Sequence, residues 1–398
     1  NRLKIIQKNY NKIISIFIVL SFIFSIDNFI HINNITSLIN PNDIISLDEY
    51  VLCSTNGGAF LYNIYTNQIN TLVDILEYQN IQTVSKDQYG RLWIGGNNPD
   101  GVMQILNSEF TLEHLLDYAN FDHIEQIVFS TNFAFALSFY KGKYGIIKYS
   151  NNESPSYLNF FDEFPYENIV INDLSVYNDT LIVASDKGLL KGYSNNNFLL
   201  FSNEWIPSYN DMNILDIVIN DSNVYIVADN QIIKNDEIVA DYQDQDFLIE
   251  SSLSYSNEIY YLTKSNLYRL DNKNVLSDIF EIPLEFKCIS PCSDQYGFSD
   301  FEVINDRFYF TIKNNGILIT DNNFNIIDNI IPNSLFKNSF NSIKYNDSNN
   351  SLYGISKEGG FVIDNPTSIN GNEYIKNFYP INFDSDDENI LTNEYYGK

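Results

Sequence analysis

Short apolar segments that alternate with polar turns recur along almost the whole chain. Each copy has an apolar strand, a polar turn that usually ends in Gly, and a second short strand. Eight copies align on one turn residue each, which is Gly58, Gly101, Gly145, Gly188, Gln231, Asn266, Gly316 and Gly360. Successive turn residues lie 43, 44, 43, 43, 35, 50 and 44 positions apart. The chain therefore repeats with a period of about 43 residues.

Each period also contains further strands on both sides of this hairpin. Alternating segments such as 80–87 and 213–221 precede it, and weaker segments such as 67–73 and 197–202 follow it. Four short strands in roughly 40–50 residues are typical of one propeller blade. The turn glycines are expected between the second and third strands, where a positive φ is needed. The sequence therefore predicts an all-β chain folded as a β-propeller of four-stranded blades.

The number of copies allows two arrangements of the blades. A segment like the start of a ninth copy lies at 390–398, and nine blades exceed the usual range of about four to eight. We therefore expect a seven-repeat propeller over 40–332 and the start of a second, truncated propeller over 338–398. A single eight-bladed propeller over 40–380 is the alternative.

The N-terminal region differs from the repeats. Four basic residues within 1–12 precede a 14-residue apolar run at 13–26. This order predicts a secretory signal peptide over 1–26, followed by a linker over 27–39. The apolar run is short for a membrane span, so we expect no span in the mature fragment, with an uncleaved anchor as the alternative.

Charge narrows the range of partners. The chain has 23 Lys and Arg against 51 Asp and Glu, which gives a formal net charge of −28. A polyanionic surface repels nucleic acid and anionic lipid and keeps a protein soluble. We therefore expect no nucleic-acid partner.

The copy that begins at Asp87 has the most distinctive sequence, "DQYGRLWIGGNNPDGV". It resembles the two-component regulator propeller repeat through Asp87, Gly90, Trp93, Gly95 and Gly101. The segment 43–63 is similar to the start of PorZ-like proteins, surface components of the type IX secretion system in Bacteroidetes-type bacteria. That resemblance implies two seven-bladed propellers followed by a β-sandwich sorting domain. It also implies export to the periplasm or outer-membrane surface of a Gram-negative bacterium.

Motifs of enzyme chemistry are absent from the sequence. It contains no G-x-S-x-G elbow, no H-E-x-x-H helix and no P-loop. The histidines are His31, in the linker, and His114 and His123, which we expect in a surface connection between the second and third copies. The sequence therefore implies no catalytic residue, no metal site and no cofactor.

A few residues remain as candidates for special roles. The repeat position of Trp93 predicts packing between blades, whereas Trp205 lies in a connection and is a candidate ligand surface. Cys288 and Cys292 are close enough in sequence to form a disulfide in an oxidising compartment, with two separate thiols as the alternative.

Taken together, the sequence predicts a non-enzymatic, exported propeller that works by binding. The expected partners are proteins or a cell-surface glycan of the lipopolysaccharide type, held at a propeller face. One alternative is the periplasmic sensor propeller of a hybrid two-component histidine kinase. Another is a propeller hydrolase or lyase acting on glycans.

Overall fold

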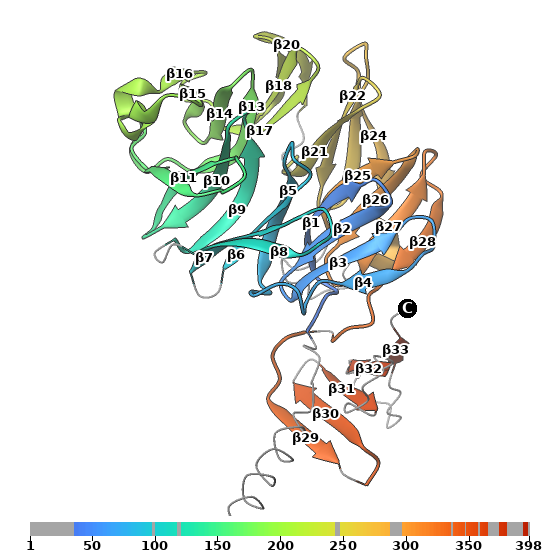
Figure 1. Cartoon of the computed structure of the whole chain (residues 1–398). Helices are drawn as coiled ribbons and strands as arrows, with labels where there is room; N and C mark the ends of the chain where they lie inside the picture. Colours follow the sequence, from blue (N-terminus) through green and yellow to red (C-terminus); the bar gives the residue numbers. More distant parts are fainter. Residues whose placement is uncertain are drawn as a thin grey trace, which may run out of the picture.

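The computed structural model describes residues 36–396, apart from 98–99, 118–120, 243–246, 287–296, 336, 347, 357–358, 365–373, 380–392. The predicted signal peptide, residues 27–35 of the predicted linker with His31, and the Cys288–Cys292 pair lie outside the described residues. The remaining chain is almost entirely β-structure, as the alternating pattern predicts (Figure 1).

Eight sheets follow one another along the chain, and in each sheet consecutive strands pair antiparallel. The first four sheets contain β1(Pro41–Leu47), β2(Tyr50–Thr55), β3(Gly58–Asn63) and β4(Ile69–Thr71); β5(Ile81–Lys86), β6(Leu92–Asn97), β7(Gly101–Leu106) and β8(Leu112–Asp117); β9(His123–Phe129), β10(Phe133–Tyr140), β11(Lys143–Ser150) and β12(Tyr157–Phe161); and β13(Ile171–Tyr177), β14(Thr180–Ser185), β15(Gly188–Tyr193) and β16(Ile206–Ser208).

The remaining four sheets contain β17(Ile214–Asn220), β18(Asn223–Ala228), β19(Gln231–Lys234) and β20(Glu237–Asp241); β21(Ile249–Tyr255), β22(Glu258–Thr263), β23(Asn266–Leu270) and β24(Leu276–Glu281); β25(Phe298–Ile304), β26(Arg307–Ile312), β27(Gly316–Asp321) and β28(Ile326–Ile330); and β29(Ser342–Asn346), β30(Ser351–Ser356), β31(Gly359–Asp364), β32(Tyr374–Tyr379) and β33(Asn393–Tyr396).

The first seven sheets form a closed ring, and we call them blades 1 to 7. Their first strands contact one another in chain order, and β25 of blade 7 contacts β1 of blade 1. At this closure Ile44 N–H donates to Asp300 Oδ2 at 2.9 Å, and Ser46 N–H donates to Glu302 Oε2 at 2.9 Å. Figure 1 shows the seven blades around a common centre and the eighth sheet outside them. The fold is thus a multi-blade β-propeller, as the repeat period predicted.

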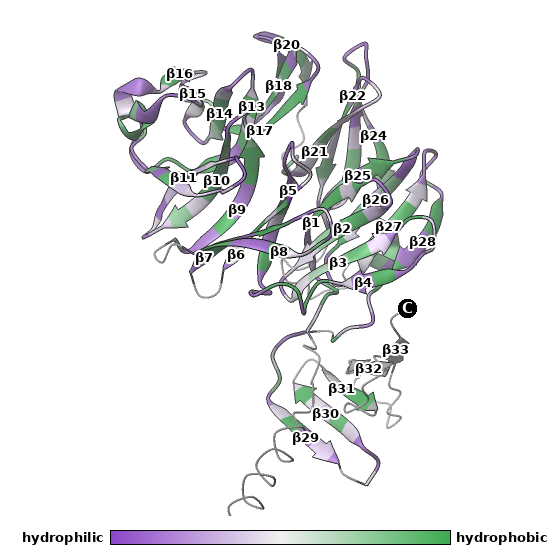
Figure 2. Ribbon diagram, in the orientation of Figure 1, coloured by the Kyte–Doolittle hydropathy of each residue, from purple (hydrophilic) through white to green (hydrophobic). Residues whose placement is uncertain are grey.

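The core of the ring is divided among the junctions between blades. Seven large apolar clusters each combine residues of two neighbouring blades, including one that joins blade 7 to blade 1. Apolar residues run along the strands while the loops are largely hydrophilic, as Figure 2 shows. Each blade is therefore stabilised mainly by apolar burial against its neighbours.

Blade 4 departs from the predicted strand pattern. The segment expected as its fourth strand, 197–202, instead contains the 3-10 helix Asn197–Leu200, and the fourth strand is β16. The Asn196 side chain accepts a hydrogen bond from Phe198 N–H and so begins the helix. Leu199 of this helix is buried with Trp205. Two further 3-10 helices span Ser202–Glu204 and Leu284–Phe286.

Candidate functional site

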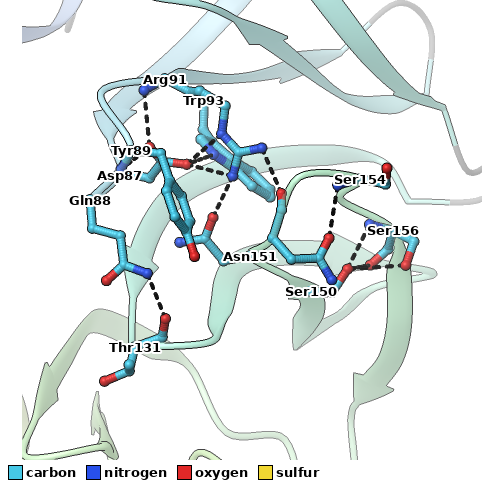
Figure 3. Close-up of polar contacts among 11 residues, drawn as sticks. Asp87, Gln88, Tyr89, Arg91, Trp93, Thr131, Ser150, Asn151, Ser154 and Ser156 are labelled. Atoms are coloured by element: carbon cyan, nitrogen blue, oxygen red, sulfur yellow. Dashed lines mark hydrogen bonds and ion pairs between the residues drawn. The ribbon is translucent and has the colours of Figure 1, made fainter.

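The residues of the most distinctive repeat form a buried polar network in blade 2 (Figure 3). Asp87 Oδ2 accepts hydrogen bonds from Arg91 Nε at 2.8 Å and from Trp93 Nε1 at 3.0 Å. Its Oδ1 accepts from the backbone N–H groups of Tyr89 and Arg91, which shapes the turn that Gly90 completes with a φ of 78°. Asp87, Arg91 and Trp93 are all buried.

This network also connects blade 2 to blade 3. Arg91 donates to the backbone carbonyl of Asn152 at 2.6 Å and to Asn151 Oδ1 at 2.7 Å, and both residues follow β11. Trp93 packs edge-to-face on Phe129 and Tyr149 of blade 3, with ring centroids 5.6 and 6.0 Å apart. The buried polar side chains of Asp87, Arg91 and Trp93 are thus all bonded within the protein, so the motif holds two blades together.

The turn glycines do not share one conformation. Gly58, Gly188 and Gly316 have positive φ, but Gly101 and Gly145 do not. In blade 3 the turn is made by Lys141 and Gly142, so the expected turn position at Gly145 is wrong. Gly145 instead lies inside β11, where an added Cβ would be 2.2 Å from the Phe160 ring. Gly360 lies in β31 and likewise has no positive φ.

Gly95 is needed for close approach between blades. An added Cβ at this position would lie 2.6 Å from Ile124 Cγ2 of blade 3. The same reason applies to Gly101, where a Cβ would lie 3.1 Å from Phe121 Cβ. These glycines therefore serve packing between blades 2 and 3.

The prediction that Trp205 forms a ligand surface is wrong. Its side chain is only 3% exposed and packs against Phe161 and Phe164. The indole Nε1 donates to the Leu199 carbonyl at 3.0 Å. The connection that carries Trp205 folds back onto the blade, and its burial could not be read from a loop-like sequence.

The two described histidines lie on strands, where a surface connection was expected. His114 belongs to β8, and His123 begins β9 and lies 2.6 Å from Glu125 Oε1. In the part of the chain that the structure describes, no group of three or more His, Cys, Asp or Glu side chains could hold a metal ion.

The centre of the ring holds a polar cavity of about 390 Å³ that all seven blades line. The first strand of each blade is the one next to the channel. In all seven blades, one residue of this strand is left unpaired opposite the second strand, at the same position, which makes a β-bulge. Such a bulge re-aims side chains. The residues just after the bulge form what we call the channel belt, and they are Asp43, Thr83, Gln126, Asp173, Asp216, Ser251 and Asp300.

The channel belt connects neighbouring blades through side-chain to backbone hydrogen bonds. Asp43 Oδ2 accepts from Val84 N–H at 2.8 Å, and Asp173 Oδ2 accepts from Ile217 N–H at 2.9 Å. Gln126 Oε1 accepts from Leu174 N–H at 2.8 Å. Asp300 accepts the same kind of bond from Ile44 N–H where the ring closes. At four of the seven junctions, a belt side chain thus accepts from the backbone N–H of the residue that follows the belt position of the next blade.

The four belt aspartates have raised pKa values. Burial is the main cause for each, and the neighbouring carboxylate adds to it at Asp300, which faces Asp43, and at Asp173, which faces Asp216. Burial raises the pKa of Asp216 to about 6. Asp43 and Asp300 face each other across the junction of blades 1 and 7, and two close carboxyl groups do not both ionise easily.

The belt was missed at the level of sequence, although a signal exists. Three first strands read apolar-x-Asp, namely "IND" at 171–173, "ILD" at 214–216 and "FSD" at 298–300. A charged residue inside an otherwise apolar strand, at the same place in several repeats, indicates a common inward position. The other blades carry Asn-Asp, Thr, Gln or Ser there, which obscures the repeat.

The chain thus belongs, by fold, to the β-propellers with a polar channel. No protein-family model and no curated protein matches its sequence. Solved structures do resemble it. One is PorZ of Porphyromonas gingivalis, described as an essential surface component of the type-IX secretion system, with 12% identity and a TM-score of 0.63 over 87% of this chain and 46% of that chain.

Two further structures widen the comparison. A streptogramin B lyase has 13% identity and a TM-score of 0.54 over 70% of this chain and 93% of that chain. The extracellular domain of a hybrid two-component system of B. thetaiotaomicron has 14% identity and a TM-score of 0.51 over 86% of this chain and 46% of that chain. The chain spans less than half of the PorZ chain. At these identities the likeness concerns the fold alone.

No helix among the described residues is long and apolar enough to cross a membrane.

Proposed function

We propose that this chain is the non-catalytic recognition propeller of an exported, PorZ-like surface protein that takes part in type IX secretion or surface attachment. It binds protein partners or a cell-surface glycan of the lipopolysaccharide type at a propeller face. The broad loop surface at the two ends of a propeller suits recognition without requiring chemistry.

The observation that carries the non-catalytic part is the use of the channel belt. Carboxylates that converge at the centre of a propeller are the natural place to look for acid and base groups. Here Asp43, Asp173 and Asp300 each accept a backbone N–H group of the neighbouring blade. These three carboxylates therefore have a structural role at the ring junctions, which supports the proposal of a non-catalytic propeller.

Genetic complementation tests the proposal. In a strain that lacks the gene, we expect surface delivery of secreted proteins to fail, and the wild-type gene to restore it. A gene with Asp173→Asn and Asp300→Asn should also restore delivery, because an amide oxygen still accepts the backbone N–H while the acid function is lost. Circular dichroism of the purified variant confirms that it folds.

Two outcomes would overturn the proposal. A folded Asp173→Asn and Asp300→Asn protein that fails to restore delivery would assign the carboxylates a chemical role. Deletion that changes transcription while delivery continues would favour the sensor propeller of a two-component system.

A further inference from the structure

The junction between blades 2 and 3 contains a complete arginine site made by the chain itself. Arg91 is the last residue of the hairpin loop of blade 2 and reaches the turn that follows the third strand of blade 3. Its guanidinium pairs with Asp87 at 2.8 Å and lies 5.0 Å from the Tyr89 ring centroid. A carboxylate, an aromatic ring and a polar turn thus hold one arginine side chain (Figure 3).

The junction between blades 1 and 2 has the same parts and lacks the arginine. The hairpin loop of blade 1 consists of Asp48 and Glu49 alone, whereas that of blade 2 runs from Asp87 to Arg91. A pocket of about 290 Å³ lies between this short loop and the turn after β7, which contributes Ser108 and Phe110. Ser108 holds the same place after its third strand as Asn152 holds after β11.

The chemistry of this pocket suits a long side chain that ends in a cation. Leu47 and Leu92 are buried and supply apolar surface, and Tyr50 packs edge-to-face on Phe110 with centroids 6.0 Å apart. Asp48 and Glu49 line the same pocket and are exposed. Neither carboxylate forms an ion pair with any residue that the structure describes.

Two lining residues of this pocket have a positive φ. Phe110 has a φ of 59° and Asp48 a φ of 24°. The same conformation recurs at matching places of other blades, at Asn178 in the hairpin loop of blade 4 and at Phe324 in the turn before β28, so it belongs to the turn types of the repeat. The turn Asp87–Gly90 before β6 resembles the turn Asn107–Phe110 before β8. Gly90 holds the place of Phe110 in it and adopts a positive φ freely. The phenylalanine side chain at this position forms one wall of the pocket.

We infer that the pocket between blades 1 and 2 binds an arginine side chain of a partner protein. This inference deepens the proposed recognition function and rests on it. The guanidinium pairs with Asp48 and Glu49, as the Arg91 guanidinium pairs with Asp87 one blade further on. The methylene stem packs on Tyr50 and Phe110. Arg suits the site better than Lys, because its planar group both stacks on rings and pairs with two carboxylates.

Lys86 provides an internal test of the charge argument. It lines the same pocket and is exposed. Two carboxylates and one ammonium leave the pocket with a net negative charge. Lys86→Gln removes the repulsive charge, so it should strengthen binding of a cationic side chain.

The experiment uses the peptide acetyl-Gly-Arg-Gly-amide as probe, with its citrulline and lysine counterparts as controls. Methyl NMR of the leucine-labelled chain follows Leu47 and Leu92 during titration. We expect saturable shifts of these methyl groups with the arginine peptide. The citrulline peptide has the same shape but no charge, so its binding should be weaker by about tenfold or more. The lysine peptide should bind less tightly than the arginine peptide.

Variants then locate the site. Asp48→Asn with Glu49→Gln should weaken binding of the arginine peptide about tenfold or more. Asp162→Asn with Glu163→Gln changes the net charge equally at exposed positions between blades 3 and 4, and should leave binding unchanged. Lys86→Gln should strengthen it.

The inference is overturned if citrulline binds as well as arginine, if both double variants weaken binding alike, or if the Leu47 and Leu92 methyl groups do not respond. Any of these results leaves the proposed function standing when the gene still supports surface delivery. Conversely, a functional arginine pocket in a strain whose delivery does not depend on the gene would refute only the proposed secretion role.

Discussion

The seven blades of the ring and the eighth sheet have similar strands but very different burial. In blade 5, Ile217 of the first strand is 6% exposed, whereas Ile343 in the first strand of the eighth sheet is 60% exposed. All five residues of β29 are exposed. Among the residues that the structure describes, the junction clusters of the ring contain eight or more buried residues each, and those around the eighth sheet contain three and two.

The first strands also differ in their backbone. Each ring strand has a bulge at the channel belt, while β29 pairs with β30 without any shift in register. The bulge lets two consecutive residues face the channel. A strand needs such a bulge only where the other six blades enclose a channel beside it. A blade sequence therefore makes a sheet by itself, but its burial and its inward-facing polar residues depend on neighbours.

The largest expected effect comes from breaking a junction of the ring. Asp87→Ala leaves the Arg91 guanidinium buried without its carboxylate and removes the acceptor of Trp93 Nε1. We expect the free energy of unfolding to fall by about 3–5 kcal/mol, as for other buried ion pairs that lose one partner. Urea unfolding followed by tryptophan fluorescence measures this loss.

The control for this prediction is an exposed ion pair of the same ring. Lys187→Ala removes the partner of Asp186, 2.8 Å away, and should change the free energy of unfolding by about 0–1 kcal/mol. Equal effects of the two substitutions would show that the blade 2 to blade 3 junction adds nothing special to stability.

A matched pair of isoleucines tests the contrast between ring and eighth sheet directly. Ile217→Ala should lower the free energy of unfolding by about 2–5 kcal/mol, because it removes buried methyl groups from the junction of blades 4 and 5. Ile343→Ala should change it by about 0.5 kcal/mol or less, since this side chain is already exposed. Urea unfolding of both variants measures the difference. A large loss at Ile343 would mean that another surface covers β29 in solution.

The pH dependence of stability separates the two regions more finely. Burial raises the pKa of Asp216 to about 6. A raised pKa means that the folded state holds its proton more tightly than the unfolded chain does. This stabilisation is complete below about pH 4 and is lost as the pH rises through about 6.

Asp216→Asn should remove that loss. The variant should match the wild type near pH 4 and exceed its free energy of unfolding at pH 7 by on the order of 2 kcal/mol. Ser342→Ala, at the corresponding place in β29, should leave the pH profile unchanged because β29 has no belt carboxylate there. Unfolding at several pH values checks this, and parallel curves for wild type and Asp216→Asn would contradict it.

Local sequence predicted the repeat architecture well, and failed where a connection folds back on its blade. The strands around Trp93 and its packing between blades followed from alternation and from the repeat position. Trp205 and the 3-10 helix at Asn197–Leu200 did not follow, because their burial depends on Phe161 and Phe164 of the preceding blade. Gly145 was misplaced because an extra Gly142 made the turn three residues earlier.

What the sequence alone determined is the unit: a four-stranded blade with apolar strands, Asn- and Asp-rich turns and a period near 43 residues. These features are local, since alternation and turn chemistry act over a few residues. The tertiary structure decided which polar residues meet at the centre and which pocket stays open between blades. Asp300 and Ile44 are 256 positions apart and become partners only when the ring closes. No local sequence pattern predicts this contact, because it depends on how seven blades pack side by side.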